Sequence, residues 1–206
     1  MSKILLINGS PHEHGCTDTA LNEIAVTLSN CGVESEIVWI GRQPVAGCIA
    51  CGKCFQTGQC VFQDKVNELV QKLDEYDGIV TGSPVYYAGP SGQLCAFLDR
   101  LFYCSGGRMA GKLAAAVVSC RRGGASAAFD RLNKYFTISN MVVVGSQYWN
   151  QVHGFTPEDV RKDEEGLQTM RTLAQNMAWL LQNRKAGEQN GVPFPQYEKR
   201  MQTNFI

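Results

Sequence analysis

Short apolar runs alternate along the chain with segments of helical periodicity. Runs of strand character occupy residues 3–7, 35–40, 78–81, 113–119 and 141–144. Between them, apolar residues repeat every three or four positions, which predicts helices at residues 17–28, 64–73, 90–102, 125–136 and 156–183. Strands this apolar are typical of parallel sheets covered on both faces. The alternation therefore predicts an α/β fold with a doubly wound, five-stranded parallel sheet.

The length of the chain bounds the number of domains. Its 206 residues, 44% of them hydrophobic, match one globular domain with one large core. We expect a single domain over residues 1–206, with a core at residues 1–185 and a polar C-terminal tail at residues 186–206.

The charge pattern argues against nucleic acid and membrane partners. Nineteen basic and nineteen acidic residues give a formal net charge of zero, and neither sign forms a long block. No apolar run approaches the ~20 residues of a membrane span, and the first residues do not form an export signal. We therefore expect a cytoplasmic protein whose nine cysteines are reduced or bind metal.

Three loops that follow predicted strands suit a ligand that contains a phosphate. The loop after the first strand is rich in glycine and leads into a helix N-terminus, where amides, Ser10 and Thr17 favour a phosphate. The loop after the third strand places Tyr86 and Tyr87 on one rim, and the loop after the fourth supplies exposed amides and two arginines. Open parallel sheets bind ligands beyond the carboxyl ends of their strands. Flavin mononucleotide (FMN) has a phosphate, a flat ring and a polar ring edge to match these loops.

A second group of candidate residues lies in the loop after the second strand. Four cysteines follow one another there with the spacing Cys48-x2-Cys51-x2-Cys54-x5-Cys60. Thiolates at this density bind an iron–sulfur cluster or zinc, because both accept four sulfurs in a tetrahedral array. The alternative is a loop without metal. The loop leaves the flavin side of the sheet, so we expect a cluster held by it to lie near the FMN rim, either within the chain or at a subunit interface.

Three motifs carry a family resemblance over roughly residues 1–150. They are Gly9-Ser10-Pro11 with Gly15 and Thr17, then Gly82-Ser83-Pro84-Val85-Tyr86-Tyr87, and Phe97-Leu98-Asp99-Arg100. In these residues the chain resembles the NAD(P)H-dependent FMN reductase family of the flavodoxin-like superfamily. The cysteine spacing is similar to that of its iron–sulfur flavoprotein branch, which implies a [4Fe-4S] cluster. The resemblance further implies a flavodoxin-like sheet of order 2-1-3-4-5 and a homodimer or homotetramer.

The resemblance also assigns residues to parts of the cofactor. It places the FMN phosphate at Ser10, His12, Cys16 and Thr17, the ring along Pro84, Val85, Tyr86 and Tyr87, and its polar edge near Ser119, Arg121, Gly123 and Gly124. The family usually has arginine where His12 stands and asparagine or serine where Cys16 stands. We expect Asp99 and Arg100 to form a structural ion pair or a dimer contact.

These observations predict an FMN-dependent NAD(P)H oxidoreductase. Electrons would pass from the reduced nicotinamide through FMN to a quinone, a flavin, a nitro or azo compound, or an iron–sulfur acceptor. Because the chemistry belongs to the cofactor, we expect no side-chain nucleophile or general base. One alternative is an iron–sulfur flavoprotein or flavodoxin-like electron carrier that does not oxidise NAD(P)H directly. A second alternative is a non-catalytic module that senses redox state through its flavin or metal.

Overall fold

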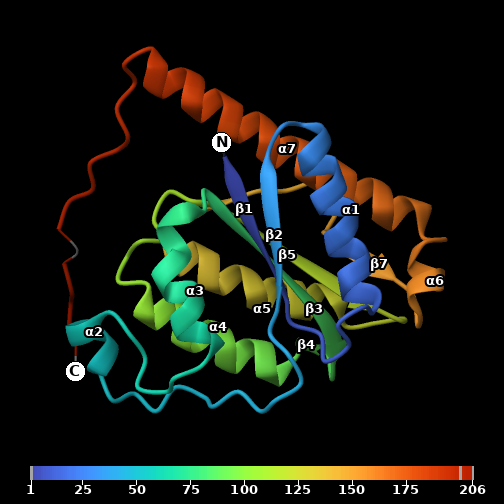
Figure 1. The fold of residues 1–206 in the computed structure, drawn as a ribbon, viewed down its shortest axis with the longest axis horizontal. Helices are drawn as coiled ribbons and strands as arrows, with labels where there is room; N and C mark the ends of the chain where they lie inside the picture. The colour runs from blue at the N-terminus through green and yellow to red at the C-terminus, as the bar shows by residue number, and fades with distance from the viewer. Residues whose placement is uncertain (1, 200, 206) are drawn as a thin grey trace.

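A mainly parallel sheet runs through the middle of the structure and carries helices on both faces (Figure 1). The computed structural model describes residues 2–199 and 201–205. The strands are β1 (Lys3–Asn8), β2 (Glu34–Trp39), β3 (Gly78–Tyr86), β4 (Gly89–Pro90), β5 (Leu113–Cys120), β6 (Val142–Val143) and β7 (Gln151–His153). The helical segments are α1 (Cys16–Asn30), α2 (Lys53–Thr57), α3 (Lys65–Lys72), η1 (Leu73–Glu75, a 3-10 turn), α4 (Gly92–Cys104), α5 (Ala125–Ile138), α6 (Pro157–Val160) and α7 (Glu164–Gln189).

The strand order confirms the predicted fold class. The hydrogen-bonded order is β2-β1-β3-β5-β6, and all of these neighbours are parallel. Counted over the five predicted strands, this order is 2-1-3-4-5, which is that of a flavodoxin-like sheet. The described sheet has seven strands, however, because β4 pairs antiparallel with β3 and β7 pairs with β5.

Two short strands share the sheet edge beside β5: β6 corresponds to the fifth predicted strand, and β7 was not predicted. β6 pairs with β5 at Leu113 and Ala114, and β7 pairs with β5 further along, at Val118 to Cys120. The chain leaves the sheet edge between the two strands and returns at Asn150, whose carbonyl accepts a hydrogen bond from Val118 N at 3.0 Å. This return brings the segment after β7 to the carboxyl end of the sheet.

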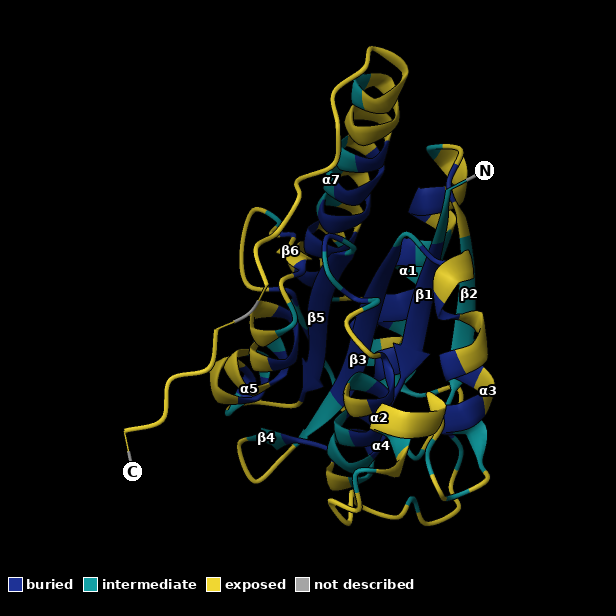
Figure 2. Cartoon of the chain, turned by 90° about the vertical axis from the view of Figure 1, so that its left-hand side faces the viewer, coloured by how far each residue is buried: buried dark blue, intermediate teal, exposed yellow. Residues whose placement is uncertain are grey.

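Apolar residues fill the space on both faces of the sheet. α3, α4 and α5 cover one face, and α1 and α7 cover the other, where they pack against each other. In Figure 2, β1, β3 and β5 are dark blue along most of their length, which shows strands buried on both sides. Within the described residues, no helix is long and apolar enough to cross a lipid bilayer.

The last predicted helix is interrupted. The prediction of one helix over residues 156–183 is wrong, because α6 ends at Val160 and α7 begins at Glu164. Asp163 starts the second helix: its side chain accepts hydrogen bonds from Gly166 N at 3.0 Å and from His153 N at 2.6 Å. A capping residue inside a helical pattern restarts the helix at that point.

Candidate functional site

A cleft of about 580 Å³ opens at the carboxyl end of the sheet. The loops that follow β1, β3, β5 and β7 line it. Nine of the predicted cofactor-binding residues meet there: Ser10, His12, Cys16, Thr17, Pro84, Val85, Tyr86, Ser119 and Arg121. The structure therefore brings together the three loops that sequence reasoning selected.

The loop after β1 is held by its own side chains. Asn8, which is fully buried, donates from Nδ2 to the Glu13 carbonyl at 2.9 Å and accepts from Ser10 N at 3.0 Å. The Ser10 hydroxyl in turn accepts from His12 N at 3.1 Å. Gly15 precedes α1 and gives it no side-chain cap. The first amides of α1 are thus left for a ligand at the positive end of the helix dipole.

A buried pair of hydroxyls lies beside this helix start. Thr17 Oγ1 and Ser119 Oγ are 2.9 Å apart, and both residues are less than 5% exposed. The pair joins the β1 loop to the end of β5. Each hydroxyl has hydrogen-bonding capacity beyond this one bond, and both residues line the cleft.

The loop after β3 forms a tight hairpin with β4. Its two turn residues, Tyr87 and Ala88, have φ angles of 49° and 59°, as a type I′ turn requires. Tyr86 lines the cleft, whereas Tyr87 points into solvent from the turn and is not among the lining residues.

The two predicted glycines also lie outside the cleft lining. Gly124 precedes α5 with a φ of 88°, and a Cβ at this position would stand 2.8 Å from Ala88 Cα. It therefore permits close packing of the hairpin, while Gly123 is exposed. Contact between FMN and Tyr87, Gly123 or Gly124 stays a prediction.

Cys16 faces the β7 loop. Its Sγ donates to the Gly154 carbonyl at 3.8 Å. Burial raises the pKa of the Cys16 thiol, with a smaller contribution from the acidic residues of α6. Cys16 is therefore a neutral thiol that links α1 to this loop.

A second cavity, of about 270 Å³, contains all four cysteines of the predicted metal loop. Cys48 and Cys51 are exposed, and Cys54 and Cys60 are half-buried. Gly52 and Gly58 flank α2 in left-handed conformation and turn the chain around the cavity. Over residues 2–199 and 201–205, no three His, Cys, Asp or Glu side chains stand close enough to hold a metal ion as placed. The sulfurs share a cavity but are not yet gathered around one point.

The second cavity, which we call the cysteine pocket, contains a fifth sulfur that the cysteine spacing did not indicate. Cys104, at the end of α4, lines the cavity and is 3% exposed. Burial, together with a smaller contribution from the neighbouring Cys54, raises the pKa of the Cys104 thiol to about 12. Cys104 is therefore a protonated thiol that packs beneath the loop as a small apolar residue would.

The two cavities lie at opposite ends of α4. The first turn of α4 adjoins the β1 loop, where Ser91 Oγ donates to the Gly9 carbonyl, and its last residues line the cysteine pocket. A helix of this length spans about 20 Å. In Figure 1, α2 lies on the far left and the start of α1 on the right. The expectation that the cysteines lie near the cleft is not met within this chain, because the loop runs back along α4.

The start of the cysteine loop nevertheless contacts the cleft loop. Trp39 Nε1 donates to the Ser10 carbonyl at 2.7 Å, and Arg42 Nε donates to the Pro11 carbonyl at 3.1 Å.

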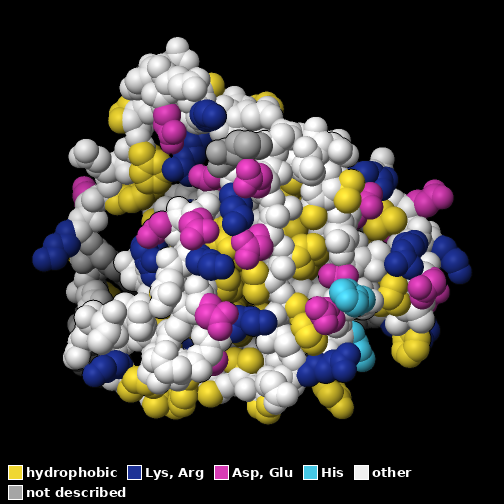
Figure 3. Space-filling model, in the orientation of Figure 1, with side chains coloured by type: hydrophobic (Ala, Val, Ile, Leu, Met, Phe, Trp, Pro, Cys, Tyr) yellow, Lys and Arg dark blue, Asp and Glu magenta, His cyan; other side chains and the backbone are white. Residues whose placement is uncertain are grey.

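Figure 3 shows histidine side chains grouped where α1 begins, and acidic and basic side chains interspersed over the rest of that face.

Comparison with known proteins bears on the whole chain. The family model for NADPH-dependent FMN reductase matches residues 2–156. The chain belongs to this family. An iron–sulfur flavoprotein from Methanocaldococcus jannaschii is 33% identical over 184 residues, which cover 85% of this chain and 95% of the relative. This likeness places the chain on the iron–sulfur flavoprotein branch of the FMN reductase family.

Solved structures agree with the fold of an FMN reductase family member. A flavodoxin from the domain Archaea has a TM-score of 0.60 and 16% identity, covering 87% of this chain and 99% of that one. RosB, solved with bound 8-demethyl-8-formylriboflavin-5'-phosphate, has a TM-score of 0.69 and 14% identity, covering 99% and 92% of the two chains. At these identities the likeness shows the shared flavodoxin-like fold.

One wall of the cleft at the carboxyl end of the sheet was not predicted from the sequence. Gly154, Phe155, Thr156 and Pro157 line the cleft from the loop between β7 and α6. Thr156 and Asp159 form a reciprocal capping box at the start of α6. Thr-Pro-Glu-Asp is a visible helix-start signal. Its place at the cleft depends on β7, which the hydrophobic pattern did not predict.

Proposed function

We propose that the protein is an FMN-dependent oxidoreductase that takes electrons from NAD(P)H, with one FMN bound in the cleft. The observation that carries the proposal is the convergence of an uncapped helix start, a buried hydroxyl pair and an aromatic hairpin on one cavity. A phosphate needs donors and positive potential, and a flavin ring needs a flat apolar wall. The cleft offers both.

The phosphate end of the proposed site lies at the start of α1. The free amides of the first turn and the Ser10 and Thr17 hydroxyls would donate to phosphate oxygens. His12 also lines the cleft and is exposed, so its side chain is free to approach an anion. Gly15 keeps this loop tight, because a Cβ there would stand 3.0 Å from His12 Cβ.

The ring end of the proposed site lies between the β3 hairpin and the β7 loop. Pro84, Val85 and Tyr86 would pack along one side of the ring, and Gly154 and Phe155 would exclude water from its edge. FMN, when bound, supplies the redox chemistry, in which hydride from NAD(P)H yields electrons for a quinone, flavin, nitro or azo compound, or iron–sulfur acceptor. The residues of this chain orient the two reactants, and Arg121 or Arg122 would pair with the nicotinamide phosphates.

We also propose that Cys48, Cys51, Cys54 and Cys60 hold a [4Fe-4S] cluster. Four soft sulfur donors within one cavity fit this group. The exposed Cys48 and Cys51 would move towards Cys54 and Cys60 as the cluster binds. The relatives named iron–sulfur flavoprotein support the same assignment.

Flavin titration of the apoprotein tests the first proposal. FMN should bind more tightly than FAD, because the cleft loop offers a cradle for one terminal phosphate. Thr17→Val should weaken FMN by about 1.5–3 kcal/mol, because a hydrogen bond to a charged acceptor is lost. Thr27→Val is the matched control, since Thr27 lies on the same helix and donates to its own backbone at Glu23. Tighter binding of FAD, or equal FMN affinity in wild type and Thr17→Val, would contradict the assignment.

Steady-state assays separate the enzyme from its alternatives. An NAD(P)H oxidoreductase oxidises NAD(P)H with an added acceptor, whereas an electron carrier does so only after a separate reductase is supplied. Iron and sulfide analysis of protein purified without oxygen tests the cluster. Cys54→Ser should lose both elements, and Cys31→Ser, outside the cysteine pocket, should retain them.

A further inference from the structure

The largest fully buried side chain of the described residues is that of Arg100, on α4. It is 1% exposed, and taking a guanidinium out of water costs several kcal/mol unless its donors are satisfied. Its closest partner is Asp64, not the neighbouring Asp99, which pairs with Tyr135 and Arg131. The two nitrogens of the fork lie 2.6 Å and 2.8 Å from the Asp64 oxygens. A bidentate pair between a buried guanidinium and a half-buried carboxylate fixes the orientation of the guanidinium.

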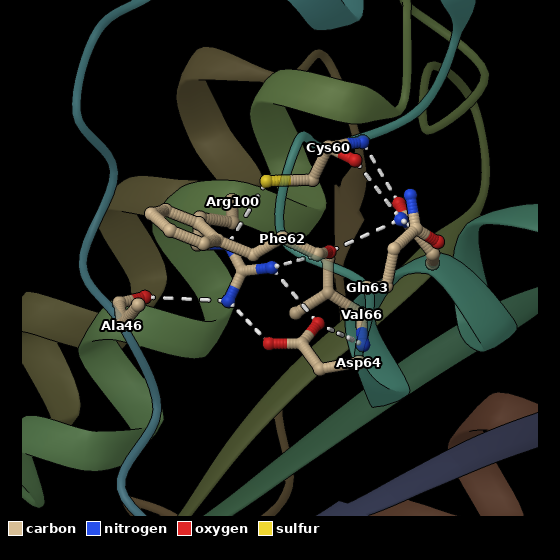
Figure 4. Close-up of polar contacts among 8 residues, drawn as sticks. Ala46, Cys60, Phe62, Gln63, Asp64, Val66 and Arg100 are labelled. Atoms are coloured by element: carbon tan, nitrogen blue, oxygen red, sulfur yellow. Dashed lines mark hydrogen bonds and ion pairs between the residues drawn. The ribbon is translucent and has the colours of Figure 1, made fainter.

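The remaining donors of Arg100 point into the cysteine loop (Figure 4). Its terminal nitrogens also donate to the carbonyls of Ala46 and Phe62, each at 3.3 Å. Its Nε donates to Cys60 Sγ at 3.1 Å. Each of the N–H groups of the guanidinium thus has an acceptor, and only one of these acceptors is a sulfur. A neutral thiol is a weak acceptor, whereas a thiolate is a strong one and is the form that binds metal.

Cys60 is also fixed through its backbone. Asn67, 4% exposed, accepts from Cys60 N at 2.8 Å and donates to Cys60 O at 3.0 Å. The Arg100 guanidinium lies 5.0 Å from the centre of the Phe62 ring, two residues further on. Hydrogen bonds at its N–H, its carbonyl and its Sγ therefore fix Cys60, whereas Cys48 and Cys51 are exposed.

We propose that Arg100 is a positioning residue for the metal group of the cysteine pocket. Its Nε–H donates to the Cys60 sulfur, and its charge offsets the negative charge of the ligated group. The inference rests on the proposed cluster site and extends it to a residue that is not a ligand. Two consequences follow: the cluster is retained more firmly, and its midpoint potential is raised, because reduction adds negative charge beside a cation.

The test compares two variants of the 206-residue chain, reconstituted with iron and sulfide without oxygen. Arg100→Lys keeps the positive charge and an ion pair with Asp64 but removes the donor to Cys60. Iron retention against a chelator should weaken roughly 10- to 100-fold, and the midpoint potential should become more negative. Asp64→Asn keeps the helix cap of α3 and the Arg100–Cys60 bond but removes a negative charge. Its midpoint potential should become more positive.

Midpoint potentials that shift in opposite directions in the two variants distinguish a positioning role of Arg100 from a purely structural one. A structural role would loosen the loop in both variants and leave the potential of the loaded protein unchanged or shifted in one direction. Arg131→Lys, at a partly exposed ion pair on α5, is the control and should match wild type. If Arg100→Lys does not fold, the sign of the Asp64→Asn shift decides.

The outcomes separate this inference from the proposal beneath it. A wild-type protein that takes up no iron and sulfide overturns the cluster site, and the role of Arg100 with it. A wild type that loads, beside an Arg100→Lys variant of equal retention and potential, overturns only the role of Arg100. A midpoint potential that becomes more negative, or does not change, in Asp64→Asn also overturns the role of Arg100.

Discussion

Replacing Gly82 by alanine should destabilise the protein through a contact between β3 and α1. A Cβ at Gly82 would stand 2.7 Å from Thr17 Cγ2 and 3.0 Å from Leu21 Cδ1. Overpacking of a core lowers the free energy of unfolding by about 1–3 kcal/mol. Alanine offsets about 0.4–1 kcal/mol of this loss, because an unfolded chain is less flexible with alanine than with glycine. The net loss of about 1–2 kcal/mol should lower the melting temperature by about 2–8 °C for a chain of this size.

The same substitution should weaken FMN binding, because it displaces the residue that carries the proposed phosphate donor. Thr17→Ser removes the obstructing methyl group and keeps the hydroxyl that meets Ser119. The Gly82→Ala/Thr17→Ser double variant should therefore recover stability. We expect a coupling free energy of about 1 kcal/mol in a double-mutant cycle measured by urea unfolding.

Gly92→Ala provides the control, because a Cβ at Gly92 meets no atom within 4 Å. Its stability should equal or exceed that of wild type. Strict additivity of Gly82→Ala and Thr17→Ser, or a Gly82→Ala variant as stable as wild type, would refute the reasoning.

Three further predictions concern single residues. A hydrogen bond from Lys3 and a second from Tyr76 lower the pKa of Glu36 below its usual value, so their stabilisation is present above about pH 4.5 and is lost as the pH falls through the folded pKa. Glu36→Gln should therefore lose less melting temperature than wild type between pH 5 and pH 3; an equal loss would contradict the role of this carboxylate. Ala50 has a φ of 53°, and Ala50→Gly should raise the free energy of unfolding by about 0.5–1 kcal/mol in urea, whereas a decrease would show that this turn is not strained. His12→Arg should tighten FMN binding in a fluorescence titration, because a guanidinium forms paired hydrogen bonds with phosphate; unchanged affinity would place residue 12 away from the phosphate.

The sequence by itself determined the fold class and most of the cleft. Strand residues such as Ile4 to Ile7 are apolar without alternation, which only a sheet covered on both faces accommodates. Loops that follow parallel strands meet at one edge whatever their detailed path. Ser10, Thr17 and Ser119 were therefore brought together as expected. The start of α3 at residue 64 was equally predictable, because the Asp64 side chain caps the helix by accepting from Val66 N within the same turn.

Only the tertiary structure decided which distant groups meet. β7 is three residues long and is stabilised by pairing with β5, so no local pattern marks it or the cleft wall that follows it. Arg100 follows Asp99 in the chain, yet α4 turns its side chain towards Asp64 and Cys60. The path of the cysteine loop along α4 likewise depends on side-chain contacts between segments far apart in sequence. Periodicity reports which face of an element is buried, but not which partner covers it.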